Sequence, residues 1–170
     1  MREIKAEELN INPFTKISND WMVLSAGTKE NGYNAMLCSW GHMGAIWQNG
    51  GGLPSVVIYI RPSRYTKEFV DREDFFTLSF FDEKYKKGMT YLGTHSGRNE
   101  DKIANAGFTP EFTDGTTYLK EANMVFVCRK LYSATLKEED FHSKKILDEC
   151  YPDKDFHDMY IAEITKILAE

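Results

Sequence analysis

The chain has 170 residues, of which 42% are hydrophobic and 28% are charged, so it can bury the core of one globular domain. Its formal net charge of −5 argues against a general nucleic-acid or membrane-surface binder, because such proteins present a basic face. No apolar run approaches the roughly 18 residues of a spanning helix, and the charged N-terminus does not resemble a signal peptide. We therefore expect a single domain over residues 1–170, located in the cytoplasm.

The spacing of cysteine and histidine predicts neither a disulfide framework nor a metal site. Cys38, Cys128 and Cys150 are far apart and form no Cys-x-x-Cys pair, which favours a reducing compartment. The histidines show no His-x-x-x-His spacing, so a zinc hydrolase is not expected. The glycine fingerprints of a dinucleotide fold and of a phosphate loop are also missing.

The first predicted elements form a hairpin. The apolar run from Trp21 to Ala26 predicts a buried strand, and Tyr33 to Ser39 predicts its antiparallel partner. Asn31-Gly32 lies between them and is a hairpin signal, since both residues tolerate a positive φ. A glycine-rich loop without regular structure is expected from Gly41 to Gly52.

Further strands are predicted over Ser55 to Ile60, Phe75 to Phe81 and Ala122 to Leu136, where β-branched and aromatic residues concentrate. The last stretch, Asp158 to Leu168, mixes helix and strand patterns. Together these segments give about five or six strands, and they do not alternate regularly with long helices. A small antiparallel barrel is therefore favoured over a doubly wound parallel sheet.

Short helices are predicted between these strands. One covers Ser63 to Arg72, with Ser63 as its N-cap. Another covers Asn99 to Ala106, and Gly107 is placed to close it in the left-handed conformation. Residues 138–149 also favour a helix.

Three segments together point to a phosphorylated aromatic ligand. A flat ligand could lie along Tyr33 to Trp40, although a plain core strand is the alternative. Arg61 to Thr66 combines arginines, hydroxyls and a helix start, which suit a phosphate or an ordinary solvated cap. Ser96 to Lys102 has the same composition, with Arg98 and Lys102 four residues apart and expected on one helix face. A simple surface helix start is the alternative there.

These segments resemble the flavin reductase-like, flavoredoxin-type proteins of the FMN-binding split-barrel family. The matching runs are N-x-M-x-x-S-W at Asn34 to Trp40, R-x-S-R-Y-T at Arg61 to Thr66 and S-G-R-x-x-D-K at Ser96 to Lys102. They occur in the family's order. A weaker fourth match runs from Asp155 to Ile164.

The resemblance implies a mainly β domain, a six-stranded antiparallel Greek-key split barrel with short flanking helices. It also implies a homodimer with FMN at the subunit interface, the rings along the first segment and the phosphate near the other two. The implied FMN-binding residues are Asn34, Ala35, Met36, Leu37, Cys38, Ser39, Trp40, Arg61, Ser63, Arg64, Tyr65, Thr66, Ser96, Gly97, Arg98 and Lys102.

The activity implied by the resemblance is electron transfer from reduced nicotinamide, NAD(P)H, through bound FMN to a flavin, a protein or a small acceptor. The alternatives are a flavoredoxin-like electron carrier, which takes its electrons from a partner protein, and a non-catalytic FMN-binding protein. His157 is the candidate catalytic residue, because some relatives receive the nicotinamide in this region. Asp158 and Ala162 replace a threonine and a glycine of the family motif, so a hydrogen-bonded histidine at a strand start is the alternative.

Overall fold

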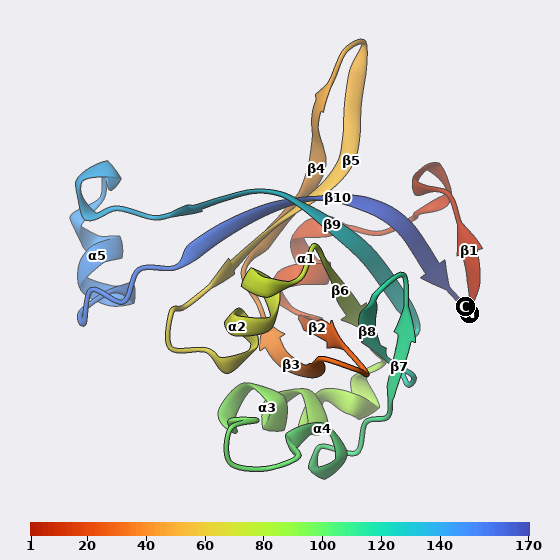
Figure 1. The fold of residues 1–170 in the computed structure, drawn as a ribbon. Coiled ribbons are helices and arrows are strands. Elements are labelled where there is room, and N and C mark those ends of the chain that lie inside the picture. The colour runs from red at the N-terminus through yellow and green to blue at the C-terminus, as the bar shows by residue number, and fades with distance from the viewer.

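A computed structural model describes residues 1–170 as one antiparallel sheet curled around a core, with short helices at its edges (Figure 1). The hydrogen-bonded order of the main sheet is β3-β2-β6-β9-β10-β5-β4, and β1 adds to β10. Its strands are β1 (Arg2–Ile4), β2 (Met22–Thr28), β3 (Gly32–Cys38), β4 (Gly41–Gln48), β5 (Gly51–Ile60), β6 (Phe75–Phe80), β9 (Met124–Thr135) and β10 (Asp158–Ala169). A separate ladder joins β7 (Pro110–Thr113) to β8 (Thr116–Leu119).

The helices are short and lie in the connections between strands. They are α1 (Pro13–Ser18), α2 (Tyr65–Arg72), α3 (Lys86–Thr94), α4 (Lys102–Asn105) and α5 (Lys144–Cys150), with 3₁₀ turns η1 (Ala6–Glu8), η2 (Glu83–Tyr85) and η3 (Glu138–Asp140). Figure 1 shows α3 and α4 below the sheet, α5 at the far end of the long β9–β10 pair, and the β4–β5 hairpin projecting above the body. No helix is both long enough and apolar enough to cross a membrane.

The core consists of two hydrophobic clusters, one on each face of the curled sheet. Successive strand residues point to opposite faces, so Leu24 and Phe126 enter the inner cluster. Their neighbours Val23 and Val125 enter the outer one. Residues of α3, α4 and β8 cover the outer cluster, and the inner cluster fills the barrel. The strand alternation therefore determines which helices can pack on which face.

The predicted mainly β, antiparallel fold is confirmed, but the strand count differs. The main sheet has eight strands rather than six. The N-terminal strand β1 and the hairpin strand β4 account for the difference, and neither carries a strong apolar run. Residues 158–168 lie in β10, which is a strand along its whole length.

The prediction of an irregular loop from Gly41 to Gly52 is wrong. These residues form β4, a two-residue turn at Asn49-Gly50 and the start of β5. Gly50 has a φ of +79°, as the turn requires. A Cβ on Gly52 would lie 2.6 Å from the Cβ of Ala45, so glycine is needed there for close strand pairing. Asn-Gly was thus a hairpin signal here as well.

All three predicted helices differ from the structure in their bounds. The helix expected over residues 138–149 is divided into the 3₁₀ turn η3 and helix α5, which begins only at Lys144. Helix α2 begins at Tyr65 with Arg64 as its N-cap and no capping side chain, so Ser63 is not the cap. Helix α4 begins only at Lys102, where the Asp101 carboxylate caps it by accepting a hydrogen bond from the N–H of Ala104. Gly107 follows with a φ of +82°, as predicted.

Candidate functional site

Two adjoining cavities lie where the end of β3 meets the start of α2 and the end of α3. We name them after their most distinctive side chains. The lysine cavity, of about 120 Å³, is lined by Met36, Leu37, Ser63, Arg64, Tyr65, Thr66, Leu92, Gly93, Thr94, His95, Ser96 and Lys102. The histidine cavity, of about 240 Å³, is lined by Met36, Leu37, Cys38, Ser39, Trp40, Tyr59, Arg61, Arg64 and His157. All three polar segments of the sequence therefore meet at one place.

Strand β3 forms the wall that both cavities share. It is an edge strand of the main sheet, so one side of its backbone has no strand partner. Met36 and Cys38 are buried in this wall, and burial raises the pKa of the Cys38 thiol to about 12. At neutral pH this thiol therefore keeps its proton and is no nucleophile. Asn34 and Ala35 lie deeper and line neither cavity.

Arg64 connects the two cavities. Its guanidinium lines both of them, and its Nη1 donates a hydrogen bond of 3.2 Å to the carbonyl oxygen of Gly93 at the end of α3. No side chain caps the start of α2, so the first backbone N–H groups of this helix remain available beside Ser63 and Tyr65. A cation and free donors at one point favour binding of an anion.

Lys102, the first residue of α4, places a second cation at the lysine cavity. The residue is only 4% exposed, and its Nζ donates to the carbonyl oxygens of Leu92 at 3.0 Å and His95 at 3.2 Å. An ammonium has three hydrogens, so one remains for a ligand. Burial, assisted by the positive charge of Arg64, lowers the pKa of Lys102 to about 8. An anion in this cavity would stabilise the charged form.

Two predicted contact residues of the third segment stand outside the cavities. Arg98 forms an ion pair with Glu68 and lies 4.6 Å from the ring centre of Tyr65. Because α4 begins at Lys102, the expected common helix face of Arg98 and Lys102 is not present. Gly97 supports the site instead, since a Cβ there would overlap Oδ1 of Asn34 and lie 3.0 Å from its Cγ.

Asn34 joins the three segments beneath the lysine cavity. Its buried Nδ2 donates a hydrogen bond of 3.0 Å to Oγ1 of Thr66, at the start of α2. The backbone of Gly97 packs on the other side of the same amide. Asn34 therefore positions the loop residues that line the cavity, without lining it itself.

Arg61 ties the connection between β9 and β10 to the barrel. Its guanidinium forms an ion pair with Asp155, donates 2.8 Å to the carbonyl oxygen of Cys150, and lies 5.2 Å from the ring centre of Tyr151. The charge of Arg61 is thus largely used within the protein. This leaves Arg64 as the unpaired arginine of the histidine cavity.

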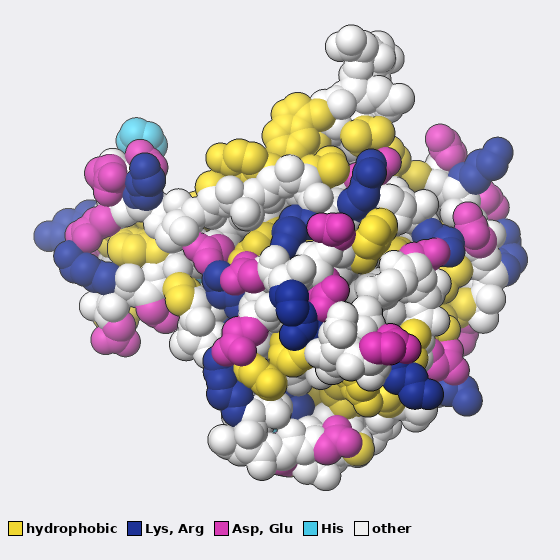
Figure 2. All heavy atoms as spheres, in the orientation of Figure 1, with side chains coloured by type: hydrophobic (Ala, Val, Ile, Leu, Met, Phe, Trp, Pro, Cys, Tyr) yellow, Lys and Arg dark blue, Asp and Glu magenta, His cyan; other side chains and the backbone are white.

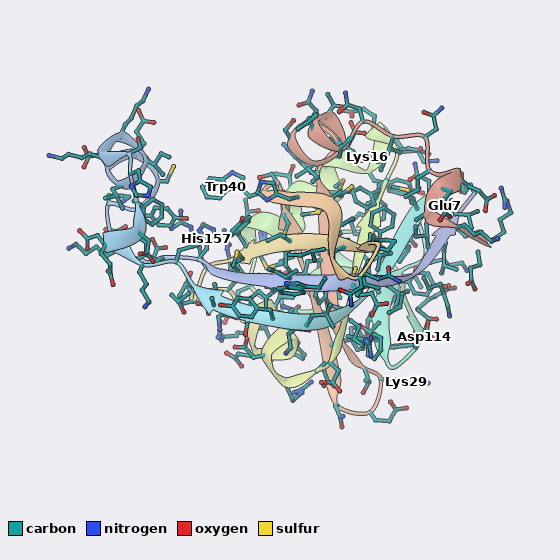
Figure 3. All side chains as sticks on the ribbon, turned by 90° about the horizontal axis from the view of Figure 1, so that it is seen from above. Glu7, Lys16, Lys29, Trp40, Asp114 and His157 are labelled. Atoms are coloured by element: carbon teal, nitrogen blue, oxygen red, sulfur yellow. The ribbon has the colours of Figure 1, made fainter.

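His157 lies at the start of β10, beside Trp40 (Figure 3). The two ring centres are 5.0 Å apart, and His157 is 8% exposed. Its Nδ1 lies 2.8 Å from the Tyr151 hydroxyl, and the two groups share one hydrogen bond. Burial, assisted by Arg61, lowers the pKa of His157 to about 4, so the ring is neutral at neutral pH. Nε2 is then the ring nitrogen that has no hydrogen-bond partner within the protein.

This neutral histidine predicts acid sensitivity. Below pH 6.5 the unfolded chain binds a proton at His157, whereas the folded protein does so only near pH 4. The free energy of unfolding should therefore fall as the pH drops through this window, by up to about 1.4 kcal/mol per pH unit. When urea unfolding is measured at pH 7 and at pH 5, the free energy of unfolding should fall less between the two pH values in His157→Gln than in the wild type. His142→Gln, an exposed site, is the control; equal losses in all three proteins would contradict the assignment.

Sequence reasoning missed several lining residues. Tyr59 lies near the end of β5, and Arg61 follows two residues later, just past the strand. This spacing, which places both side chains on one side of the chain, was a signal that could have found Tyr59. The end of α3 and Tyr151 gave no such signal, because only the folding of distant segments brings them here. The missed lining and supporting residues are Tyr59, Leu92, Gly93, Thr94, His95 and Tyr151.

Comparison with protein families gives one clear result. The model of the flavin reductase like domain matches residues 14–170. A direct search of curated protein sequences gave no match.

Comparison with solved structures supports the same architecture. Flavoredoxin of Desulfovibrio vulgaris (Miyazaki F) has a TM-score of 0.66 and 19% identity, covering 100% of this chain and 77% of its own. An FMN-binding protein from Thermus thermophilus has a TM-score of 0.68 and 19% identity, and the match covers 100% of this chain and 82% of that protein. A putative flavin reductase with a split barrel domain from Shewanella frigidimarina has a TM-score of 0.67 and 14% identity, and the match covers 96% of this chain and 76% of that protein. The fold is therefore that of the split barrel.

Proposed function

The chain belongs to the flavin reductase-like domain family, and on that premise we propose that it binds FMN and works as an oxidoreductase. The observation that carries the proposal is the pairing of a cavity holding two cations with a second cavity walled by an edge strand and aromatic rings. A flavin nucleotide has the matching halves, an anionic phosphate and a flat ring system. Of the 16 binding residues inferred above, 12 line the cavities, Asn34 and Gly97 support their walls, Ala35 lies deeper in β3, and Arg98 is held outside by Glu68.

The phosphate is assigned to the lysine cavity. Arg64 and the free hydrogen of Lys102 supply charge, and the hydroxyls of Ser63 and Ser96 supply neutral donors. The backbone N–H groups at the uncapped start of α2 add to this set. These groups offset the repulsion that a net charge of −5 exerts on a dianion.

The ring system is assigned to the histidine cavity, along β3. Met36 and Trp40 supply apolar contact, and the free backbone side of β3 supplies hydrogen-bonding groups. Bound FMN would supply the redox chemistry, accepting a hydride from a donor and passing electrons on. His157 would offer its Nε2 as a hydrogen-bonding group, while the protonated thiol of Cys38 serves only as packing.

The direct test is reconstitution. Purified protein mixed with FMN and passed over a desalting column should retain flavin absorption near ~450 nm. Loss of all flavin on the column, at a protein concentration in the tens of micromolar, would overturn the proposal. This measurement does not depend on the electron donor.

Arg64→Ala should weaken FMN binding by about 1–3 kcal/mol, because a charge-assisted hydrogen bond to phosphate is lost. The residue is exposed, so the fold should tolerate the change. Quenching of FMN fluorescence measures the dissociation constant. Arg129→Ala, which removes an arginine paired with Glu163 away from both cavities, should bind FMN like the wild type. Unchanged affinity in Arg64→Ala would remove this arginine from the phosphate site.

We propose first that the protein is a reductase whose electron donor is reduced nicotinamide, NADH or NADPH. The second candidate is a flavoredoxin-like carrier that receives electrons from a partner protein. It is favoured by one observation, that Arg61 is already paired with Asp155, so few cations beside the histidine cavity can meet a dinucleotide. Anaerobic addition of NADH or NADPH separates the two, because rapid bleaching of bound FMN identifies a reductase and unchanged colour identifies a carrier.

We also propose that the protein is a homodimer and that it is located in the cytoplasm. A homodimer with the flavin site at the subunit contact would cover the open side of the histidine cavity, and sedimentation with and without FMN tests it. A reducing cytoplasm agrees with three free cysteines, of which Cys38 and Cys128 are buried. A monomer at micromolar concentration, with FMN bound, would overturn the shared site.

A further inference from the structure

A third cavity, much larger than the other two, borders the proposed flavin site. Its volume is about 690 Å³, within the range typical of small-molecule sites. It shares Ser39, Trp40 and Tyr59 with the histidine cavity, so the two cavities adjoin at these residues. Helix α1, strand β4 and the ends of β3, β5 and β9 surround it. We call it the apolar cavity; its lining is Pro13, Phe14, Ile17, Ser18, Ser39, Trp40, Gly41, His42, Met43, Tyr59, Leu136 and Tyr151.

The lining of the apolar cavity contains no Asp, Glu, Lys or Arg. Its polar side-chain groups are hydroxyls, the indole N–H of Trp40 and one imidazole, that of His42, whose Nδ1 lies 3.4 Å from the Tyr59 hydroxyl. A charged ligand would lose hydration here without gaining a partner of opposite charge. Phe14, Trp40 and Tyr151 offer ring faces and edges for stacking. The chemistry of this wall therefore selects for an uncharged, flat molecule.

We propose that the apolar cavity binds an uncharged planar ring compound of one or two rings, such as a quinone, and that this is the small electron acceptor of the protein. The role as acceptor rests on the proposed function, whereas the binding does not. A quinone becomes a hydroquinone by taking up one hydride, which carries two electrons and one proton, and one further proton from water. The hydride would pass directly from reduced FMN to the quinone, with the two rings in contact where the cavities adjoin beside Ser39, Trp40 and Tyr59.

A dinucleotide donor is a poor match for the same space. Its diphosphate is charged, and no cation in the lining could meet it. The apolar cavity is therefore assigned to the acceptor, not to NADH or NADPH.

The test compares two probes of the same shape. 2-Naphthol is uncharged, and naphthalene-2-sulfonate carries one negative charge. Calorimetric titration of the protein, first without FMN and then loaded with it, should show 2-naphthol binding at least roughly tenfold tighter than the sulfonate. Equal affinity for the two probes would overturn the proposal.

Variants locate the binding. Met43→Glu, on β4, places a carboxylate inside the apolar cavity. Phe14→Asp places one at the rim of the cavity, and because Phe14 is 82% exposed, this substitution should not destabilise the fold. Each should weaken 2-naphthol binding at least roughly tenfold. Leu131→Glu, the matched control, adds the same charge to an exposed β9 residue outside the cavity and should leave binding unchanged.

The outcomes separate this inference from the proposed function. Full 2-naphthol affinity in both Met43→Glu and Phe14→Asp would overturn the assigned cavity, whatever the FMN result. Failure to bind 2-naphthol would also overturn it, whether the protein sediments as a monomer or as a dimer. A protein that binds 2-naphthol selectively but does not bind FMN would contradict the proposed function and leave this inference standing.

Discussion

Lys102→Met should weaken FMN binding by roughly 10- to 100-fold, because a charged hydrogen bond to the phosphate contributes about 1.5–3 kcal/mol. Methionine has a similar volume and suits a residue that is 4% exposed, so the core should remain filled. Titration of FMN fluorescence measures the effect. Lys87→Met, at an exposed position of α3, is the matched control and should bind FMN as the wild type does. Wild-type affinity in Lys102→Met would remove the lysine from the site.

The pH dependence of FMN binding gives a sharper version of the same test. In the free protein the Lys102 ammonium loses its proton above its pKa of about 8, and bound phosphate restores it. Binding then takes up a proton, so the dissociation constant should rise by up to about tenfold per pH unit above pH 8. Lys102→Met has no proton to lose there, so its affinity, although weaker, should stay flat through the same range. The same rise in both proteins would contradict this assignment.

Gly97→Ala should destabilise the fold by about 1–3 kcal/mol, since the added methyl overlaps the buried amide of Asn34. That amide holds Thr66, so the start of α2 and the loop at Ser96 should both shift and FMN affinity should fall as well. Urea unfolding and FMN titration measure the two effects.

A glycine without close neighbours provides the control for this substitution. Gly44→Ala on β4 adds the same methyl where nothing lies within 4 Å, and it should change neither quantity. If Gly97→Ala matched Gly44→Ala in both measurements, the support that Asn34 gives to the site would be disproved.

The strands were predictable because burial on one or both faces leaves a pattern in the sequence. Met22–Thr28 begins with an apolar run, whereas Phe75–Phe80 and Met124–Thr135 are rich in β-branched and aromatic residues. The structure pairs β2 with β6 and β6 with β9. The β4–β5 hairpin was missed because it projects from the body, so its first strand has few buried side chains and no such pattern. Its Asn49-Gly50 turn carried the only local signal.

Helix α3 was missed because its sequence, KKGMTYLGT, contains two glycines and two threonines, which lower its helix propensity. Its glycines allow close packing instead: a Cβ on Gly88 would lie 2.6 Å from the carbonyl oxygen of Ala106, and one on Gly93 would lie 3.1 Å from Leu37. Tertiary contact, not local propensity, stabilises this helix.

The candidate site was predictable where a motif lies in one stretch of chain. Arg64 and Lys102 were named from their segments, and the structure brings both to one cavity. Gly93 and Tyr151 were not named, because their place at the site depends on how distant segments pack. Arg98 shows the reverse case, since its motif position was clear but Glu68 holds its side chain away.

The lysine cavity lies at the seam between the two halves of the core. Met36 on its wall belongs to the inner hydrophobic cluster, whereas Leu92 belongs to the outer one. A nucleotide seated there would touch both halves and bind only when they are packed together. Saturating cofactor at about 100 times its dissociation constant would then add about 2.7 kcal/mol to the folded state. In a cell, flavin supply would thus decide how much of this protein survives heat and proteolysis.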